Sequence, residues 1–190
     1  MNGPTPSNIL CRRLVCAGLA GLAVLLLLGA VALLGGYNIA ADAPHTRPVL
    51  WLLQTVRDHS IAARAGDAVV PADLGSAARI VAGAGLYNEM CSGCHLGPGL
   101  EPSEISQGLY PRAPELSRGS PLSPAEKFWV IKHGIKMTGM AAWGPTHNDK
   151  LIWDMVAFVQ KLPGMSAAQY QQAVKTAPQD HDEMMKGMKM

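Results

Sequence analysis

Two cysteines and a histidine lie within five residues near the middle of the chain, in the sequence Cys91-Ser-Gly-Cys94-His95. Two thiols separated by two residues, with a histidine directly after the second, form the attachment signature of c-type haem. Each thiol can add to one vinyl group of the porphyrin, and the histidine can then supply the proximal ligand of the iron. We therefore predict one covalently bound haem c, held by Cys91, Cys94 and His95.

Two other kinds of site use closely spaced cysteines. A thioredoxin-like redox pair expects a βαβ setting, whereas the residues around Cys91 have a helical pattern. A zinc site built on four cysteines needs a second pair, and the remaining cysteines, Cys11 and Cys16, lie beside an apolar N-terminal segment. A mixed cysteine and histidine zinc site stays open as an alternative.

The apolar N-terminal segment predicts where this motif lies in the cell. Residues 14–34 carry no charge, and a helix of that length spans about 31 Å, close to the hydrocarbon core of a bilayer. Arg12 and Arg13 precede it directly, and the next basic residue is Arg47. The positive-inside rule then puts the N-terminus in the cytoplasm and the motif in the periplasm, beyond a single-pass anchor in a bacterial inner membrane. A cleaved signal peptide is the alternative, but its apolar region is shorter, about 7–15 residues.

The composition follows the same division. Hydrophobic residues make up 48% of the chain and charged residues only 16%, against about 25% charged in an ordinary soluble domain. All 14 acidic residues follow residue 41, as do 14 of the 16 lysines and arginines, so the net charge of +2 comes from Arg12 and Arg13. The neutral remainder argues against a nucleic-acid partner. No nucleophile with its base and no glycine-rich phosphate loop is evident, so we expect neither an enzyme nor a small-molecule substrate.

We divide the chain into four parts. They are the cytoplasmic N-terminus and transmembrane anchor (1–41), a linker with an amphipathic helix (42–75), the haem domain (76–165) and a flexible Met-rich tail (166–190). In the linker, Val49, Leu52, Leu53 and Val56 recur at helical spacing after Pro48. This helix either packs on the haem domain or lies at the membrane surface.

The tail contains groups that could bind a soft metal. These are His181, Met184, Met185, Met188 and Met190. Thioethers suit Cu(I), so copper handling is one alternative, although a disordered end is the interpretation that we favour.

The segment around the motif resembles the monohaem class I cytochrome c family, over about residues 76–163. In GAGLYNEMCSGCH, Gly83 lies eight residues and Tyr87 four residues before Cys91. The family has a small residue and an aromatic residue there, on the inner face of the helix that leads to the haem. The resemblance implies an all-α fold, a class I cytochrome c domain behind one N-terminal transmembrane helix.

The resemblance also implies how the proximal side is built. A loop rich in glycine and proline follows His95, as in the family, and Pro98 is the residue expected to fix the His95 ring, with Pro102 as the alternative. Tyr87 is expected near the haem as a core aromatic residue. The helix predicted over residues 148–162 would cross the first helix of the haem domain, which leads into the haem motif. Trp153 would be the aromatic residue of that contact.

The sixth ligand is expected after another helix. Ser123-Pro124 is a helix-start signature, and Gly134 marks the end of that helix, which puts Met140 in the following loop. The family has a similar Thr-Gly-Met phrase at the distal ligand, so the resemblance implies Met140, and Met137 is the alternative. The family's proline after this methionine is replaced by Ala141.

Three further residues lie near the expected ligand. Trp143 shields the haem or bonds a propionate, or else it simply packs in the core. His133 and His147 are expected at the surface.

Charges within the haem domain separate along the sequence. Residues 89–115 hold four acids and one base, whereas residues 125–150 hold four lysines, Lys127, Lys132, Lys136 and Lys150, against Glu126 and Asp149. A cationic rim around an exposed haem edge would steer an acidic redox partner, and a generic solvated face is the alternative.

These features together predict an electron-transfer protein. We expect a membrane-anchored c-type cytochrome that passes single electrons between redox protein partners on the periplasmic side, alone or as a subunit of a respiratory oxidoreductase complex. A haem-based gas or redox sensor, with an open or exchangeable distal position, and a copper-associated accessory protein are the alternatives.

Overall fold

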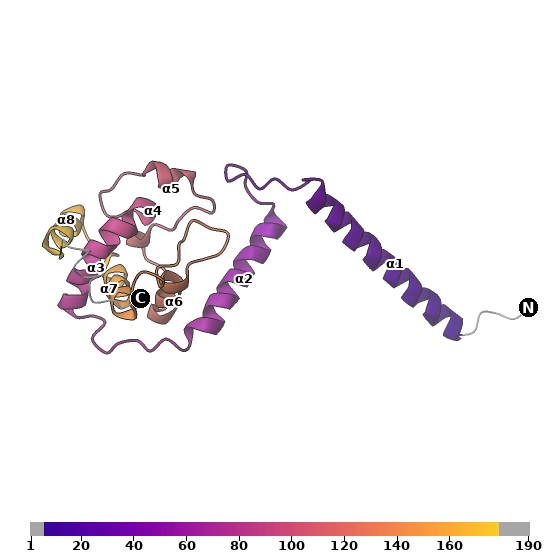
Figure 1. The fold of residues 1–190 in the computed structure, drawn as a ribbon, viewed down its shortest axis with the longest axis horizontal. Helices are drawn as coiled ribbons and strands as arrows, with labels where there is room; N and C mark the ends of the chain where they lie inside the picture. The colour runs from indigo at the N-terminus through magenta and orange to yellow at the C-terminus, as the bar shows by residue number, and fades with distance from the viewer. Residues whose placement is uncertain (1–5, 179–190) are drawn as a thin grey trace, which may run out of the picture. The chain divides into compact units, whose positions relative to one another are not determined.

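The first of two compact units contains the apolar helix. The computed structural model describes residues 6–178 and divides the chain after Ala43 (Figure 1). Helix α1 (Pro6–Leu33) includes a segment, Leu10–Leu33, with a mean hydropathy of 2.7 and none of it buried in the unit. By length and composition this is a candidate membrane-spanning helix, and it covers most of the predicted anchor.

The second unit is also helical, and no strand occurs among residues 6–178, which confirms the all-α prediction. Its elements are α2 (Arg47–Ala65), α3 (Ala77–Met90), α4 (Ser92–His95), α5 (Glu104–Gly108), the 3₁₀ helix η1 (Leu116–Arg118), α6 (Pro124–His133), α7 (Asp149–Lys161) and α8 (Ala167–Thr176). The expected helix boundaries agree with side-chain caps. Ser123 and Glu126 form a capping box at the start of α6, Gly134 ends it, and the Asn148 side chain accepts from the backbone N–H of Leu151 at the start of α7.

The core is centred on the crossing of α3 and α7, which make the most extensive helix contact of the unit (Figure 1). Gly83 is required there, because a Cβ atom at this position would lie 2.0 Å from the carbonyl oxygen of Asp154 and 2.9 Å from the Cβ of Phe158. One turn later on α3, the ring of Tyr87 lies 5.4 Å from that of Phe158. Phe158, not Trp153, is therefore the aromatic residue of this contact.

Trp153 points to a different neighbour than we expected. Its ring stacks on Phe128 of α6, with centroids 4.3 Å apart and planes 16° apart. Residues 154 and 158 are one turn apart and share the face of α7 that meets α3, so residue 153 is turned toward α6 instead.

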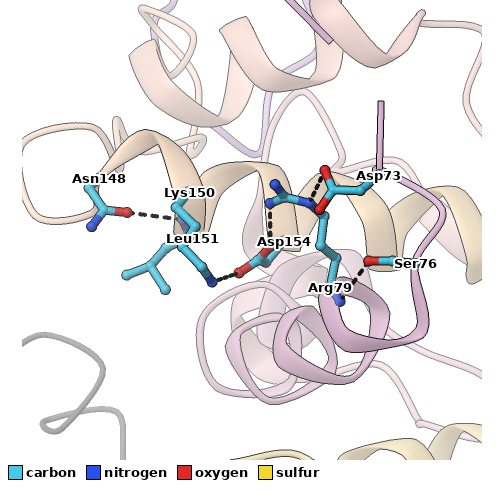
Figure 2. Close-up of polar contacts among 7 residues, drawn as sticks. All are labelled: Asp73, Ser76, Arg79, Asn148, Lys150, Leu151 and Asp154. Carbon is cyan, nitrogen blue, oxygen red and sulfur yellow. Dashed lines mark hydrogen bonds and ion pairs between the residues drawn. The ribbon is translucent and has the colours of Figure 1, made fainter. Parts of the chain in front are cut away.

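A buried carboxylate joins the same two helices (Figure 2). Asp154 of α7 is fully buried, and it pairs with Arg79 of α3 and with Lys150 one turn earlier on α7, both at 2.7 Å. Arg79 also pairs with Asp73 in the loop before α3, at 3.0 Å. The network thus ties that loop, the start of α3 and α7 together, and it compensates a charge that would be costly to bury alone.

Helix α8 extends the packed unit past residue 165, where we expected the domain to end. Tyr170 is fully buried against Tyr87 and Phe158, and its hydroxyl donates to Asn88 of α3 at 3.1 Å. A capping box formed by Ser166 and Gln169 starts the helix. Residues up to 178 therefore belong to the packed unit and not to a flexible tail. The tail residues His181, Met184, Met185, Met188 and Met190 lie outside the described residues.

The linker helix α2 packs on the domain along one face only. It contacts α6, and near its C-terminal end Ile61 and Ala65 are buried. Of the apolar stripe expected to pack, Val49 and Leu53 are partly buried, whereas Leu52 and Val56 are exposed. The sequence pattern alone could not separate these two faces, because both carry apolar residues.

Candidate functional site

The two cysteines of the motif lie on one helical turn where α3 meets α4. The backbone N–H of Cys91 donates to the carbonyl oxygen of Tyr87. The backbone N–H groups of Cys94 and His95 both donate to the carbonyl oxygen of Cys91, at 3.1 and 2.8 Å. These hydrogen bonds fix the backbone of the three motif residues relative to one another. Neither cysteine forms a disulfide, so both sulfur atoms could form thioethers with two vinyl groups.

The two thiols have different surroundings. Cys91 is buried among core residues, whereas Cys94 is partly exposed. Burial raises the pKa of the Cys91 thiol to about 12, with the neighbouring Cys94 as a smaller cause. This raised pKa favours the protonated form of the thiol, which is less nucleophilic than the thiolate.

His95 is oriented by a backbone carbonyl. Its Nδ1 atom lies 2.8 Å from the carbonyl oxygen of Pro114. Because a carbonyl can only accept, Nδ1 carries the proton and Nε2 keeps its lone pair for a metal. Burial lowers the pKa of His95, and the bond to Pro114 opposes this only in part, so the imidazole is held in the neutral form that can act as a ligand.

This arrangement corrects our expectation for the proximal loop. The residue that fixes the His95 ring is Pro114, and neither Pro98 nor Pro102 does so. Pro98 follows Gly97, which lies against the ring of Tyr170. The sequence hint at Pro114 was the PRAP segment at 111–114, but the path of the long loop from residue 96 could not be inferred from local patterns.

Tyr87 acts on the site through the residue after the motif. Its hydroxyl donates to the carbonyl oxygen of Leu96 at 2.6 Å. Leu96 has φ 59° and ψ −172°, a region that only glycine occupies without strain. Tyr87 itself is fully buried, and burial raises the pKa of its phenol, so the donating proton stays in place.

The loop after α6 holds Met140 against the core. The backbone N–H of Ile135 donates to the carbonyl oxygen of Met140, and the N–H of Met140 donates to the hydroxyl of Thr138, both at 3.1 Å. Gly134, with φ 66°, permits this close return, because a Cβ atom there would lie 2.7 Å from the Met140 oxygen. Met137, the alternative ligand, is 83% exposed, whereas Met140 is partly buried and packs on the core cluster.

The comparison with known families decides what this arrangement is. Residues 78–159 match the family described as cytochrome c oxidase, cbb3-type, subunit III. Residues 78–159 form a class I cytochrome c domain. The chain has no significant match among curated proteins or solved structures. The matched range runs from the start of α3 to the end of α7, and so contains both the haem motif and Met140.

A cytochrome c domain binds haem c covalently, and the residues present fit that group. Cys91 and Cys94 would form the thioethers, each by adding its S–H across one vinyl group. His95 offers a neutral Nε2, and Met140 offers a soft thioether, the ligand pair of many c-type haems. Among the described residues, no group of three His, Cys, Asp or Glu side chains is placed to hold a metal ion.

Trp143 of the cytochrome c domain packs rather than projecting to solvent. Its side chain is partly buried against the core cluster, and its ring lies 5.5 Å from that of His147. Its backbone N–H donates to the carbonyl oxygen of Ile131 in α6. His147 is only 4% exposed, so our expectation of a surface histidine was wrong there. The reason is the turn at 143–147, in which the His147 N–H donates back to Trp143 and draws the ring inward. His133 is exposed, as expected.

The lysine-rich face of the cytochrome c domain is largely compensated. Lys132 pairs with Asp149 at 2.6 Å, and Lys150 pairs with the buried Asp154. Lys127 donates to Gln160. Because two of the four lysines have acidic partners, the cationic surplus is smaller than the sequence count indicated, and Lys136 is its remaining exposed member.

Proposed function

We propose that this chain is a membrane-anchored electron carrier with one haem c, which passes single electrons between redox proteins on the periplasmic face of a bacterial inner membrane. The family shows a cytochrome c domain, and such a domain implies redox partners. When bound, the haem supplies a one-electron couple between ferrous and ferric iron. The family described as an oxidase subunit supports placement in or beside a respiratory complex.

The proposal is supported by hydrogen bonds that hold both residues proposed as iron ligands, His95 and Met140. The Pro114 carbonyl fixes the tautomer of His95, and hydrogen bonds to Ile135 and Thr138 hold the Met140 backbone close to the core. A site closed on both sides suits electron transfer, because little must move when one electron arrives. A methionine ligand also favours the reduced state relative to a second histidine.

The location rests on the N-terminal unit. Leu10–Leu33 has the length and hydropathy of a membrane span, and Arg12 and Arg13 lie near its start. Basic residues favour the cytoplasmic side, so the positive-inside rule supports a periplasmic domain.

Carbon monoxide tests whether the distal position is closed. The reduced full chain in detergent at neutral pH should give the same visible spectrum with and without carbon monoxide, because Met140 occupies the sixth position. A rapid, complete spectral change on adding the gas would instead support a gas sensor and contradict the carrier.

A further inference from the structure

Helix α2 carries an exposed apolar face that the domain does not cover. Trp51, Leu52 and Val56 are 67%, 53% and 58% exposed, on the same helix that buries Ile61 and Ala65 against the domain. We call the exposed side the outer face of α2. It consists of Pro48, Trp51, Leu52, Thr55, Val56, His59, Ala62 and Ala63.

The outer face is free of formal charge along the whole helix. At about 100° per residue, its members span an arc of about 140°. At the same spacing, Arg47 and Asp58 fall within about 40° of one edge of this arc, whereas Arg57 and Arg64 fall on the opposite side of the helix, about 80–100° beyond the other edge. An apolar, tryptophan-containing arc with the charged residues on the rest of the helix is the pattern of a helix that lies in a membrane interface.

The chain itself brings this helix to the bilayer. Residues 34–46 join the end of α1 to the start of α2, a segment that spans on the order of 45 Å when fully extended. Its last part is already fixed to the domain, because the backbone N–H of His45 donates to the Tyr110 hydroxyl at 2.9 Å. If α1 crosses the membrane, this tether keeps the start of α2 within about that distance of the bilayer.

Charge favours lipid over an apolar protein partner as the occupant. Three arginines against one aspartate give α2 a surplus of positive charge. Of these, Arg57 pairs with Asp58 at 2.7 Å and Arg64 donates to the Ser60 hydroxyl at 2.9 Å, so Arg47, near one edge of the outer face, is the arginine best placed for an anionic headgroup.

We propose that the outer face of α2 binds the bilayer surface beside the anchor and holds the cytochrome c domain in one orientation. This inference rests on the proposed function in that α1 must span the membrane. The orientation would reach the haem site through α6, which contacts α2 and whose residues Ile131 and Lys132 accept hydrogen bonds from Trp143 and Gly144 of the distal loop. The haem edge would then face partners from a fixed side.

Spin labels on the full haem-loaded chain in nanodiscs test the proposal. The lipid is a mixture of phosphatidylcholine and phosphatidylglycerol, Cys11 and Cys16 are replaced by serine, and the haem is reduced. Labels at Leu52→Cys and Val56→Cys should collide more with oxygen, which concentrates in lipid, than with a water-soluble nickel complex. The matched control is Gln54→Cys, which is exposed on the opposite side of the same helix, with Gln171→Cys on α8 as a second one. Both should show the reverse preference.

The outcomes separate this proposal from the anchor. A label at Leu25→Cys in α1 reports whether α1 is in lipid. Lipid-like collisions at 25 with water-like collisions at 52 and 56 would overturn the outer-face proposal alone. Protection from both reagents at 52 and 56 would also overturn it, because a protein partner or a second copy would then cover the face. Water-like collisions at 25 would overturn the anchor and this proposal together.

Introducing negative charge on the outer face gives an independent measurement. In Leu52→Glu with Val56→Glu, the chain should stay in the membrane after alkaline extraction and keep its haem spectrum. A spin label attached at Trp51→Cys should collide more with oxygen in the chain that is otherwise unchanged, and should lose this preference in the double glutamate variant. Retention of this preference would contradict the role of the outer face.

Discussion

The hydroxyl of Tyr87 donates a hydrogen bond of 2.6 Å to the carbonyl oxygen of Leu96, the residue that directly follows His95, the proposed haem ligand. This bond holds Leu96 at φ 59° and ψ −172°, where a non-glycine residue costs about 1–3 kcal/mol. The core aromatic residue of α3 thus controls how the chain leaves His95. Its side chain is a positioning group, and it need not touch the cofactor to matter.

Removing that hydroxyl should destabilise the domain. Tyr87→Phe should lower the free energy of unfolding of the haem-loaded chain by about 1–2 kcal/mol, because a mostly enclosed carbonyl loses its donor. Denaturant titration followed by haem absorbance measures this. The loss should be smaller when Leu96→Gly is also present, since glycine adopts the same backbone angles without strain. An equal or larger loss in that background would contradict the link between the two residues.

The crossing of α3 and α7 should tolerate no side chain at Gly83. A Cβ atom there would overlap the backbone oxygen of Asp154, so Gly83→Ala should lower stability by at least about 3 kcal/mol or prevent folding. Gly66→Ala is the matched control, because a Cβ atom at Gly66 has no neighbour within 4 Å and its φ is −62°. Thermal unfolding should show a change within about 1 kcal/mol for the control. Similar effects of both substitutions would argue against the close crossing.

The buried carboxylate of Asp154 should contribute far more than its exposed partner. Asp154→Asn leaves Arg79 without a buried counter-charge and should cost about 3–5 kcal/mol. Lys150, whose side chain is 70% exposed, should cost under about 1 kcal/mol on substitution to alanine. Chemical denaturation of the two variants measures the ratio. Comparable losses would mean that the network in Figure 2 is not asymmetric in this way.

Haem attachment should depend on one pair of cysteines only. Cys91→Ala or Cys94→Ala should leave a single thioether, and the double variant should release all haem under denaturing conditions. Cys11→Ser with Cys16→Ser should keep the haem attached, because both residues lie in α1 and outside the motif. Intact mass after denaturation reads the outcome and the number of haems. Covalent haem in the double Cys91 and Cys94 variant would contradict the assignment.

The parts of the site that the sequence predicted are those set by short-range patterns. The haem motif needs only five adjacent residues, and Ser123, Gly134 and Asn148 are local helix caps that fix where α6 and α7 begin or end. The position of Met140 in a loop follows from the cap at Gly134, whereas its role as the iron ligand is implied by the family resemblance and stays a prediction. These features depend on neighbours a few residues away, which a single sequence contains.

The parts that the sequence did not predict depend on long-range contacts. The carbonyl group of Pro114 meets His95 from 19 residues away, through a loop whose path no local pattern predicts. Phe158, and not Trp153, contacts α3 because packing sets the rotation of α7 about its axis. The burial of Tyr170 could have been suspected from the capping box at Ser166, but its partners come from α3 and α7. The ion pair of Lys132 with Asp149 also joins residues 17 positions apart, so a count of charges could not show that these two side chains meet.

The proposed electron carrier requires that His95 and Met140 both bind the haem iron. One absorption measurement tests this most directly. The oxidised full chain at neutral pH should show the weak charge-transfer band of methionine bound to low-spin ferric iron. Met140→Ala should abolish this band, and Met137→Ala, at an exposed position in the same loop, should leave it unchanged. A band that survives Met140→Ala, or one that is lost in Met137→Ala, would contradict the account.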